Sequence, residues 1–166
     1  MLTQLARWRV PLGFLSFVVA FWLVTPTTAS VLAGAAVAFV GQALRVWAAG
    51  HIEKGAEVTR SGPYRLMRHP LYVGSGIMAV GFGIAAASIG TAVLVLAYFL
   101  VTYVAAMRSE EATLDQRFDG EYAAYRAGRA AEVVRRFSAH RAFGRNREYR
   151  SVAGLVCVFV LLWLRV

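Results

Sequence analysis

The sequence predicts an all-α fold: a multi-pass bundle of transmembrane helices that forms one domain over residues 1–166. Hydrophobic residues make up 58% of the chain and charged residues only 16%, which is more apolar than a soluble domain of this size normally is. Five apolar segments alternate with polar connections, and the arginines gather in some of these connections and avoid others. Together these observations favour an integral membrane protein.

The five apolar segments are Leu12–Val24, Val31–Gly50, Leu71–Ala87, Ala92–Met107 and Val152–Leu164. About 20 helical residues cross the hydrocarbon core of a bilayer. The second segment has this length, and the third and fourth approach it once their uncharged flanks are included. The first is short, but no small-residue cleavage site follows it, so we expect a retained helix. The last is short enough to be tilted, re-entrant or interfacial, and we therefore expect about five membrane segments.

Charge predicts the orientation of these helices. The connections Thr25–Ser30 and Ser88–Thr91 carry no charge, whereas Lys54–Arg68 and Arg108–Arg150 hold most of the basic residues. The positive-inside rule therefore places the N-terminus and both long polar regions in the cytoplasm. The abundance of Ala and Arg beside a single Lys is typical of a bacterium of high GC content, so we expect the bacterial inner (plasma) membrane.

The net charge of +9, from 18 Lys and Arg against 9 Asp and Glu, bears on the partners. In a chain with membrane spans, anionic lipid headgroups are a better counterpart than nucleic acid. We expect the basic stretch Arg126–Arg150 to be a headgroup anchor. The single Cys157 excludes an internal disulfide and a zinc–thiolate site. The three histidines lie in different segments without metal-ligand spacing, so no metal site is predicted.

Small residues crowd the second and third apolar segments, and they predict close helix packing within one bundle or between two. They are Gly34, Ala38, Gly41, Gly74, Gly76, Gly81 and Gly83. Gly81, Gly83 and Ala86 also match a loose dinucleotide pattern, but that pattern needs a βαβ unit and is rejected here. Arg45, in the inner part of the second segment, is expected to snorkel to the interface. Alternatively, it pairs with an acidic residue such as Glu53, or it lines a polar cavity.

Two polar clusters lie at the ends of the third and fourth segments. One is Gly62–Gly74, with the sequence GPYRLMRHPLYVG, and the other is Arg108–Arg126. If the two segments form a hairpin, both clusters return to the same membrane face, where polar groups usually mark a site. Beyond Glu110 the chain keeps apolar residues at helical spacing, so we expect the fourth helix to continue and to break near Asp119–Gly120.

These clusters resemble the isoprenylcysteine carboxyl methyltransferase and phospholipid methyltransferase family of integral membrane enzymes. The resemblance covers Lys54–Phe137. It rests on Ser61-Gly62-Pro63-Tyr64, on Arg68-His69-Pro70-Leu71-Tyr72-Val73-Gly74, and on Glu110-Glu111 followed by Leu114, Phe118, Tyr122 and Tyr125. It implies S-adenosyl-L-methionine as the cofactor and methyl transfer to a lipophilic acceptor: the carboxylate or amine of a lipid, an isoprenoid or a prenylated compound.

The resemblance also implies site residues. Glu110 would hold the amino group of the cofactor, and the other cofactor-binding residues would be Glu57, Val58, Tyr64, Arg68, His69, Pro70, Leu71 and Tyr72. The candidate catalytic residues are Arg108, Glu111 and His69. A carboxylate acceptor is already ionised at neutral pH and needs no base. An amine acceptor would need one, and His69 or Glu111 could serve.

Each residue also has a structural interpretation. His69 could cap the third helix before Pro70, and Glu110 and Glu111 could form a solvated face beside Arg108. We expect Tyr122 and Tyr125 to pack against the membrane surface. Two other functions stay open. One is an NADPH-dependent membrane reductase resembling the sterol reductases, with Arg60 and Arg65 on the 2′-phosphate, and the other is a non-catalytic lipid-binding membrane protein.

Overall fold

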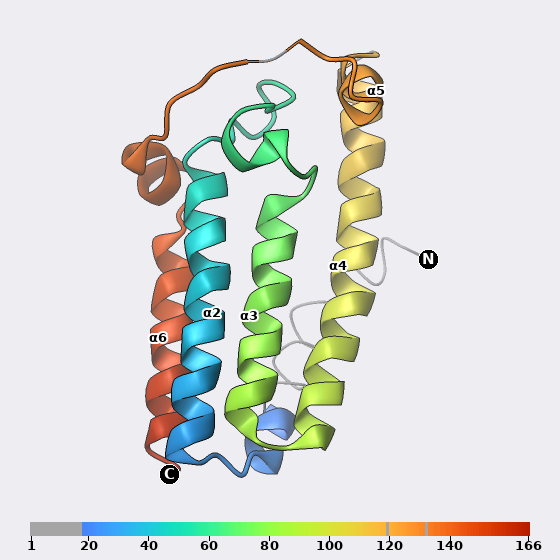
Figure 1. The fold of residues 1–166 in the computed structure, drawn as a ribbon. Helices are drawn as coiled ribbons and strands as arrows, with labels where there is room; N and C mark the ends of the chain where they lie inside the picture. The colour runs from blue at the N-terminus through green and yellow to red at the C-terminus, as the bar shows by residue number, and fades with distance from the viewer. Residues whose placement is uncertain (1–17, 119, 132) are drawn as a thin grey trace.

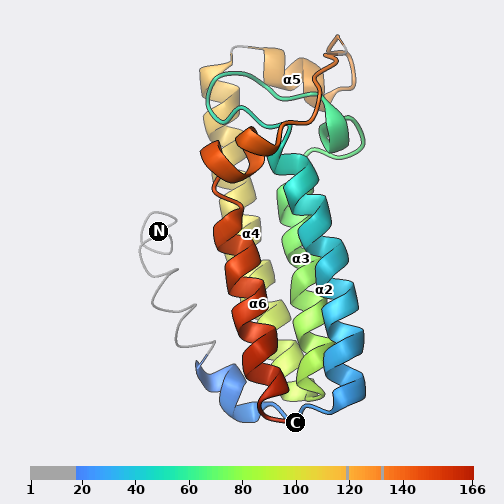
Figure 2. The same ribbon diagram turned by 90° about the vertical axis from the view of Figure 1, so that its left-hand side faces the viewer.

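A computed structural model describes residues 18–118, 120–131 and 133–166, which contain helices and no strand (Figure 1). Residues 18–23 are helical. The elements that follow are α2 (Thr28–Ala49), the 3₁₀ helix η1 (Gly62–Arg65), α3 (Pro70–Ala86), α4 (Ile89–Arg117), α5 (Glu121–Arg126), the π-helix η2 (His140–Arg145) and α6 (Tyr149–Trp163). The four long helices α2, α3, α4 and α6 run side by side in both views (Figures 1 and 2). The all-α prediction is confirmed for the described residues.

Among the described residues, two helices are long and apolar enough to cross a membrane, α2 with 22 residues and α4 with 29. The other two, α3 and α6, are also apolar but shorter, with 17 and 15 residues. The predicted segments Val31–Gly50, Leu71–Ala87, Ala92–Met107 and Val152–Leu164 correspond to these four helices. Residues 12–17 of the first predicted segment lie outside the described residues, and residues 18–23 of it are helical.

Helix boundaries follow from local sequence signals. α2 begins at a capping box in which Thr27 and Ser30 each accept a hydrogen bond from the other's backbone N–H. α3 begins with Pro70 at its first position, where the missing N–H costs nothing. The tight α3–α4 connection has Ala87 in the left-handed region at φ 48° and Ser88 as the N-cap of α4. The two neighbouring helices therefore form the predicted hairpin.

Glycines bring α2 and α3 into backbone contact. A Cβ added to Gly41 would lie 2.5 Å from the carbonyl oxygen of Gly74, and one added to Gly81 would lie 2.7 Å from the backbone nitrogen of Ala38. Such distances are too short for any side chain, so the close packing predicted from small residues occurs within one bundle. This contact holds α2 and α3 close together, and the loop after α2 and the turn before α3 both lead into the site described below.

The fourth helix extends well beyond its apolar part. It continues through Glu110 to Arg117, and α5 begins at Glu121 after Gly120, which has a φ of 76°. The predicted continuation and the break after it are confirmed, although Asp119 is outside the described residues. Only 6% of the most apolar window of α4 is buried within the protein, against 28% for α2. α4 therefore leaves most of its apolar surface for other contacts.

Arg45 does not snorkel, and the expectation that it would is wrong. Its Nη2 lies 2.7 Å from Oε1 of Glu148, just before α6, and its Nη1 donates to Oγ of Ser75 at 2.5 Å. Glu148 is 4% exposed, so this is a buried ion pair that joins α2, α3 and the start of α6. The alternative partner Glu53 instead accepts hydrogen bonds from Arg141 and Arg145.

The basic stretch expected to be a lipid anchor folds partly onto the protein itself. Arg135 makes an ion pair with Glu57 at 2.7 Å, and Arg141 donates to the carbonyl of Gly50 at 2.6 Å. The Asn146 side chain donates to the carbonyl of Ala49 at 2.8 Å. These donors satisfy carbonyls at and just beyond the C-terminus of α2, which have no intrahelical partner. Residues 135–146 thus hold the 50–59 loop in place.

Candidate functional site

The cavity between the α3 and α4 ends

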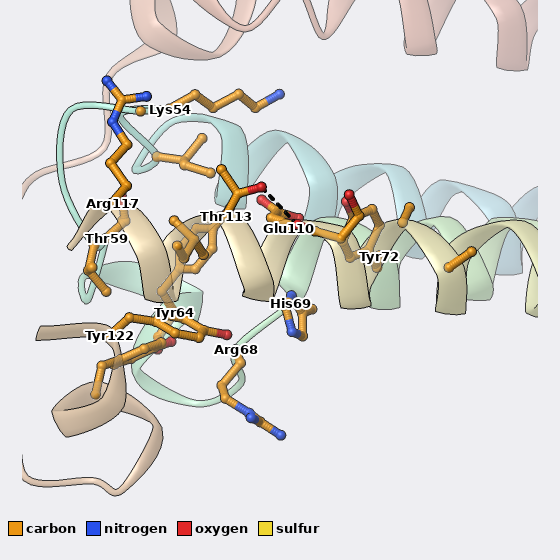
Figure 3. Close-up of a pocket in the computed structure, with 18 of the residues that line it drawn as sticks. Lys54, Thr59, Tyr64, Arg68, His69, Tyr72, Glu110, Thr113, Arg117 and Tyr122 are labelled. Carbon is orange, nitrogen blue, oxygen red and sulfur yellow. Dashed lines mark hydrogen bonds between the residues drawn. The ribbon is translucent and has the colours of Figure 1, made fainter. Parts of the chain in front are cut away.

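A cavity of about 800 Å³ lies where the 50–69 region, α4 and α5 meet (Figure 3). We call it the main cavity. A second cavity of about 470 Å³ adjoins it and shares Tyr64, Arg68, His69, Tyr72 and Glu110 as lining residues. The second cavity ends on the Arg45–Glu148 ion pair. The hairpin therefore does bring the two polar clusters to one site.

The main cavity has two unlike ends. Its polar end is lined by charged and hydroxyl side chains, among them Lys54, Thr59, Arg68, Glu110, Thr113 and Arg117. Its other end follows one side of α4 and is lined by Leu94, Ala97, Val101 and Ala105. These four positions are three or four residues apart, so they share a helix face. The cavity can accommodate a ligand or ligand pair that is charged at one end and apolar at the other.

Glu110 is the acidic group of the polar end. It lines both cavities, and within the described part of the chain no hydrogen bond or ion pair engages its carboxylate. Figure 3 shows it on α4 between Thr113 and Tyr72. A carboxylate held in a cavity without a protein partner is available to a cationic ligand group.

Tyr64 faces it with an unused hydroxyl. The side chain is 7% exposed and lines both cavities, and its hydroxyl is buried without a hydrogen-bond partner in the described structure. Burial raises the pKa of this phenol far above its ordinary value, so it stays protonated at any physiological pH. Gly62 has a φ of 58° and rests on the ring of His51, so a side chain there would clash. This glycine sets the turn that presents Tyr64.

His69 and Glu111 form a pair beside the cavity. His69 occupies the N-cap position of α3, but its side chain makes no capping hydrogen bond. Its Nε2 instead lies 2.9 Å from Oε1 of Glu111, which also accepts hydrogen bonds from Arg68 at 3.4 Å and from the hydroxyl of Tyr122 at 3.2 Å. Burial, with the Glu111 charge second, raises the pKa of Tyr122 to about 12, so this phenol remains a donor.

The predicted cofactor-binding residues lie mostly together. Those that line the main cavity are Glu57, Val58, Tyr64, Arg68, His69, Tyr72 and Glu110. Leu71 lines only the second cavity, and Pro70 is buried at the start of α3 and lines neither. Both carboxylate oxygens of Glu57 are engaged by Arg135.

The predicted catalytic residues are divided. His69 lines both cavities. Glu111 lines neither and contacts the site through His69, and Arg108 is exposed and lines neither. The structural interpretation of the acidic pair as a solvated face beside Arg108 is wrong for Glu111, whose partners come from α5 and from the turn before α3.

Sequence reasoning missed several lining residues: Lys54, Thr102, Arg117, Tyr122 and Tyr125. The expectation that both tyrosines pack on the membrane surface is wrong. Tyr122 is 2% exposed, and the Tyr125 hydroxyl donates to the carbonyl of Tyr64 at 2.5 Å. The spacing of Glu110, Leu114 and Phe118, four residues apart, was the available signal for this face, since all three line the cavity.

Comparison with known proteins

Residues 8–121 match the family model described as phospholipid methyltransferase. Two curated relatives are similar in sequence. The nickel-cobalt-cadmium resistance protein NccN of Alcaligenes xylosoxydans is 38% identical over 87 residues, which cover 51% of this chain and 39% of NccN. The cobalt-zinc-cadmium resistance protein CzcN of Cupriavidus metallidurans is 40% identical over 111 residues, which cover 65% of this chain and 49% of CzcN.

This chain therefore covers less than half the length of either curated relative. No solved structure matches it. In the described ranges, no group of three or more His, Cys, Asp or Glu side chains is placed to hold a metal ion. The family match covers more than half of the chain and includes both Gly62–Gly74 and the Glu110–Glu111 pair, so this chain belongs to the phospholipid methyltransferase family.

Proposed function

We propose that this protein is an integral membrane methyltransferase that uses S-adenosyl-L-methionine and methylates a lipophilic acceptor at the cytoplasmic boundary of the membrane. One observation carries the proposal: the Glu110 carboxylate and the Tyr64 hydroxyl, neither of which has a partner in the described part of the chain, share a cavity whose opposite end is apolar. Membership of a methyltransferase family supports the same reaction class.

The residues present fit this cofactor. When bound, it supplies an electrophilic methyl group on a positively charged sulfonium, and it carries an ammonium, a carboxylate and an adenine. Glu110 would accept hydrogen bonds from the ammonium, and Arg68 or Lys54 would pair with the carboxylate. Tyr64 and Tyr72 offer aromatic faces to the base or the sulfonium. The buried Tyr64 hydroxyl would gain a partner that the described residues do not provide.

The apolar end fits the acceptor. From Leu94 to Glu110 the cavity follows α4 for about 24 Å at 1.5 Å per residue. An acceptor with an acyl or isoprenoid chain would lie along Leu94, Ala97 and Val101, with its reactive head near Glu110. Transfer of this kind depends on alignment of the two reactants and exclusion of water, and the cavity lining would supply the alignment.

His69 supplies the proton chemistry if the acceptor needs it. Its Nε2 faces the Glu111 carboxylate, so its Nδ1 is the ring nitrogen left to accept a proton from an amine. A carboxylate acceptor would leave this pair with a purely orienting role. Arg108, which is exposed, would meet an acceptor's anionic head only at the outer rim of the site.

The membrane arrangement is part of the proposal. We infer that α3, α6 and the segment Leu12–Val24 join α2 and α4 to make about five membrane segments. The basic residues of the 50–69 and 126–150 regions would then face the cytoplasm of a bacterium, at its inner membrane. The cofactor would reach the polar end of the cavity from water, and the acceptor would enter from the lipid beside α4.

The reductase alternative has weaker support. Arg60 and Arg65, its candidates for binding a 2′-phosphate, line neither cavity, and Arg60 forms an ion pair with Glu121 of α5. The two curated relatives are named for metal resistance, and their names state no methyl acceptor.

Calorimetric titration of the full chain in detergent tests the proposal, with S-adenosylhomocysteine and NADPH as separate ligands. We expect S-adenosylhomocysteine to bind and NADPH to give no heat. A second assay adds methyl-labelled cofactor to membranes containing the protein and counts label in the lipid extract. Binding of NADPH but not of S-adenosylhomocysteine at millimolar concentration would replace methyl transfer with the reductase reading. If neither S-adenosylhomocysteine nor NADPH binds, a non-catalytic, lipid-binding role would remain.

A further inference from the structure

The short helix α5 connects three separate parts of the site. It lies between Gly120 at φ 76° and Gly128 at φ 68°, and an added Cβ at either glycine would meet no atom within 4 Å. Both turns therefore depend on backbone conformation that favours glycine, not on lack of space. They fold α5 back over the polar end of α4 (Figure 1). From there Glu121 pairs with Arg60, Tyr122 reaches α4, and Tyr125 reaches η1.

Tyr122 acts on the carboxylate that orients His69. Its hydroxyl donates to Oε1 of Glu111 at 3.2 Å, and Nε2 of His69 lies 2.9 Å from the same oxygen. Tyr122 is 2% exposed and so has little freedom to move. Two buried or half-buried groups that share one acceptor restrict its position together, because each hydrogen bond is directional.

Tyr125 acts on the backbone that presents Tyr64. Its hydroxyl donates to the carbonyl of Tyr64 at 2.5 Å. Because the phenol of Tyr64 makes no hydrogen bond of its own among the described residues, backbone contacts and packing are what position it. A second backbone hydrogen bond of Tyr64 is local, from its N–H to the carbonyl of Ser61, so Tyr125 adds a bond from a distant part of the sequence.

We propose that Tyr122 and Tyr125 are positioning residues of the methyl-transfer site. Tyr122, through Glu111, fixes the imidazole of His69, and Tyr125, through the Tyr64 carbonyl, fixes the phenol of Tyr64. The inference deepens the proposed function and rests on it for its link with the cofactor. According to this proposal, α5 fixes the positions of His69 and Tyr64 before any ligand binds.

The test compares Tyr122→Phe and Tyr125→Phe, which keep the aromatic rings and remove only the hydroxyls. Tyr149→Phe, an exposed tyrosine at the start of α6, is the matched control. Affinity for S-adenosylhomocysteine is measured by calorimetry on the full chain. We expect each site variant to bind about threefold to tenfold more weakly, as the loss of one hydrogen bond predicts, and the control to bind as the wild type does.

Nuclear magnetic resonance of histidine- and tyrosine-labelled protein gives a readout that needs no ligand. The chain has three histidines and seven tyrosines, so the His69 and Tyr64 signals can be assigned by substitution. We expect Tyr122→Phe to move the His69 signals and Tyr125→Phe to move those of Tyr64, without the reverse effects. If Tyr122→Phe does not fold, Glu111→Gln tests the same relay to His69.

The outcomes separate the two claims. Wild-type protein that binds no S-adenosylhomocysteine contradicts the proposed function, while the resonance shifts still decide whether the tyrosines position His69 and Tyr64. Unchanged His69 and Tyr64 signals in the two variants overturn the positioning roles, even if binding weakens. Shifted signals with unchanged affinity overturn the link between positioning and the cofactor.

Discussion

Between α2 and α3, glycines let two backbones touch, whereas between the ends of α3 and α4 a cavity of about 800 Å³ separates the chain segments. The first region is apolar and has no room for a methyl group at Gly41 or Gly81. Among the described residues, the carboxylate of Glu110 in the second region has no partner and the buried hydroxyl of Tyr64 there has no hydrogen bond. The α2–α3 contact is tightly packed. The cavity is not, and we expect a ligand to occupy it.

The difference separates stability from binding. Substitutions in the α2–α3 contact should lower the free energy of unfolding and act on ligands only through the fold. Substitutions at its joint with α6 should also lower the free energy of unfolding, although Arg45 and Glu148 line the second cavity as well. Substitutions that line the cavity should change ligand affinity at little cost in stability, because their polar groups contribute few contacts within the protein.

The Arg45–Glu148 ion pair, which joins α2 and α3 to α6, should show the largest effect on the free energy of unfolding. Arg45→Met leaves the buried Glu148 carboxylate without its partner and should destabilise the protein by about 3–5 kcal/mol. The measurement is thermal unfolding in detergent. The double variant Arg45→Met/Glu148→Met should regain part of the loss, and Arg129→Met, which removes an exposed arginine, is the control. Equal midpoints for wild type and Arg45→Met would mean that the ion pair is dispensable.

A smaller loss is expected inside the α2–α3 contact. Gly34→Val would place its Cβ 2.6 Å from that of Ala85 and against the carbonyl of Gly81, so the helices must separate at a cost of about 2–3 kcal/mol. Gly154→Val on α6 is a matched control, since nothing lies within 4 Å of a Cβ added there. Similar midpoints for the two valine variants would refute the backbone contact.

A substitution at the apolar end of the cavity should change substrate binding and not stability. Val101→Trp would fill part of the groove on α4 and raise the KM for the lipophilic acceptor about tenfold, with unchanged affinity for S-adenosylhomocysteine. Val93→Trp lies on the same helix but lines neither cavity, so it should leave both values as they are. Weaker S-adenosylhomocysteine binding by Val101→Trp alone would place the cofactor, not the acceptor, at this end.

The smallest change in stability is expected at Arg68. Its side chain is 47% exposed and its contact with Glu111 is 3.4 Å long, so Arg68→Gln should alter the free energy of unfolding by about 0.5 kcal/mol or less. Its effect on S-adenosylhomocysteine affinity should be larger, because it lines both cavities. A loss of stability without a loss of affinity would mean that Arg68 stabilises the fold and does not bind the cofactor.

The sequence predicted the elements whose signals are local. Apolar runs gave α2, α3, α4 and α6 their approximate bounds, and the hairpin between α3 and α4 implied that the two polar clusters meet. Family resemblance selected Tyr64, His69 and Glu110, which do line one cavity. The helices and the hairpin needed only helix length, helix period and chain direction, whereas the site residues came from the resemblance.

Long-range pairings were not predictable in the same way. Arg45 pairs with Glu148, 103 residues away, and several arginines compete for few carboxylates, so spacing alone cannot choose among them. The fold-back of α5 depends on two glycines whose left-handed conformation the sequence permits but does not require. This is why Tyr122 and Tyr125 were placed on the membrane surface and not at the cavity.

The most direct test compares two carboxylates on α4, Glu110 in the cavity and Asp115 outside it. Calorimetric titration of S-adenosylhomocysteine is run on wild type, Glu110→Gln and Asp115→Asn, with thermal midpoints measured on the same samples. We predict that Glu110→Gln loses about tenfold to a hundredfold in affinity while its midpoint stays near that of wild type, and that Asp115→Asn changes neither value. Equal affinity in Glu110→Gln and wild type would contradict the assignment of this cavity to the cofactor.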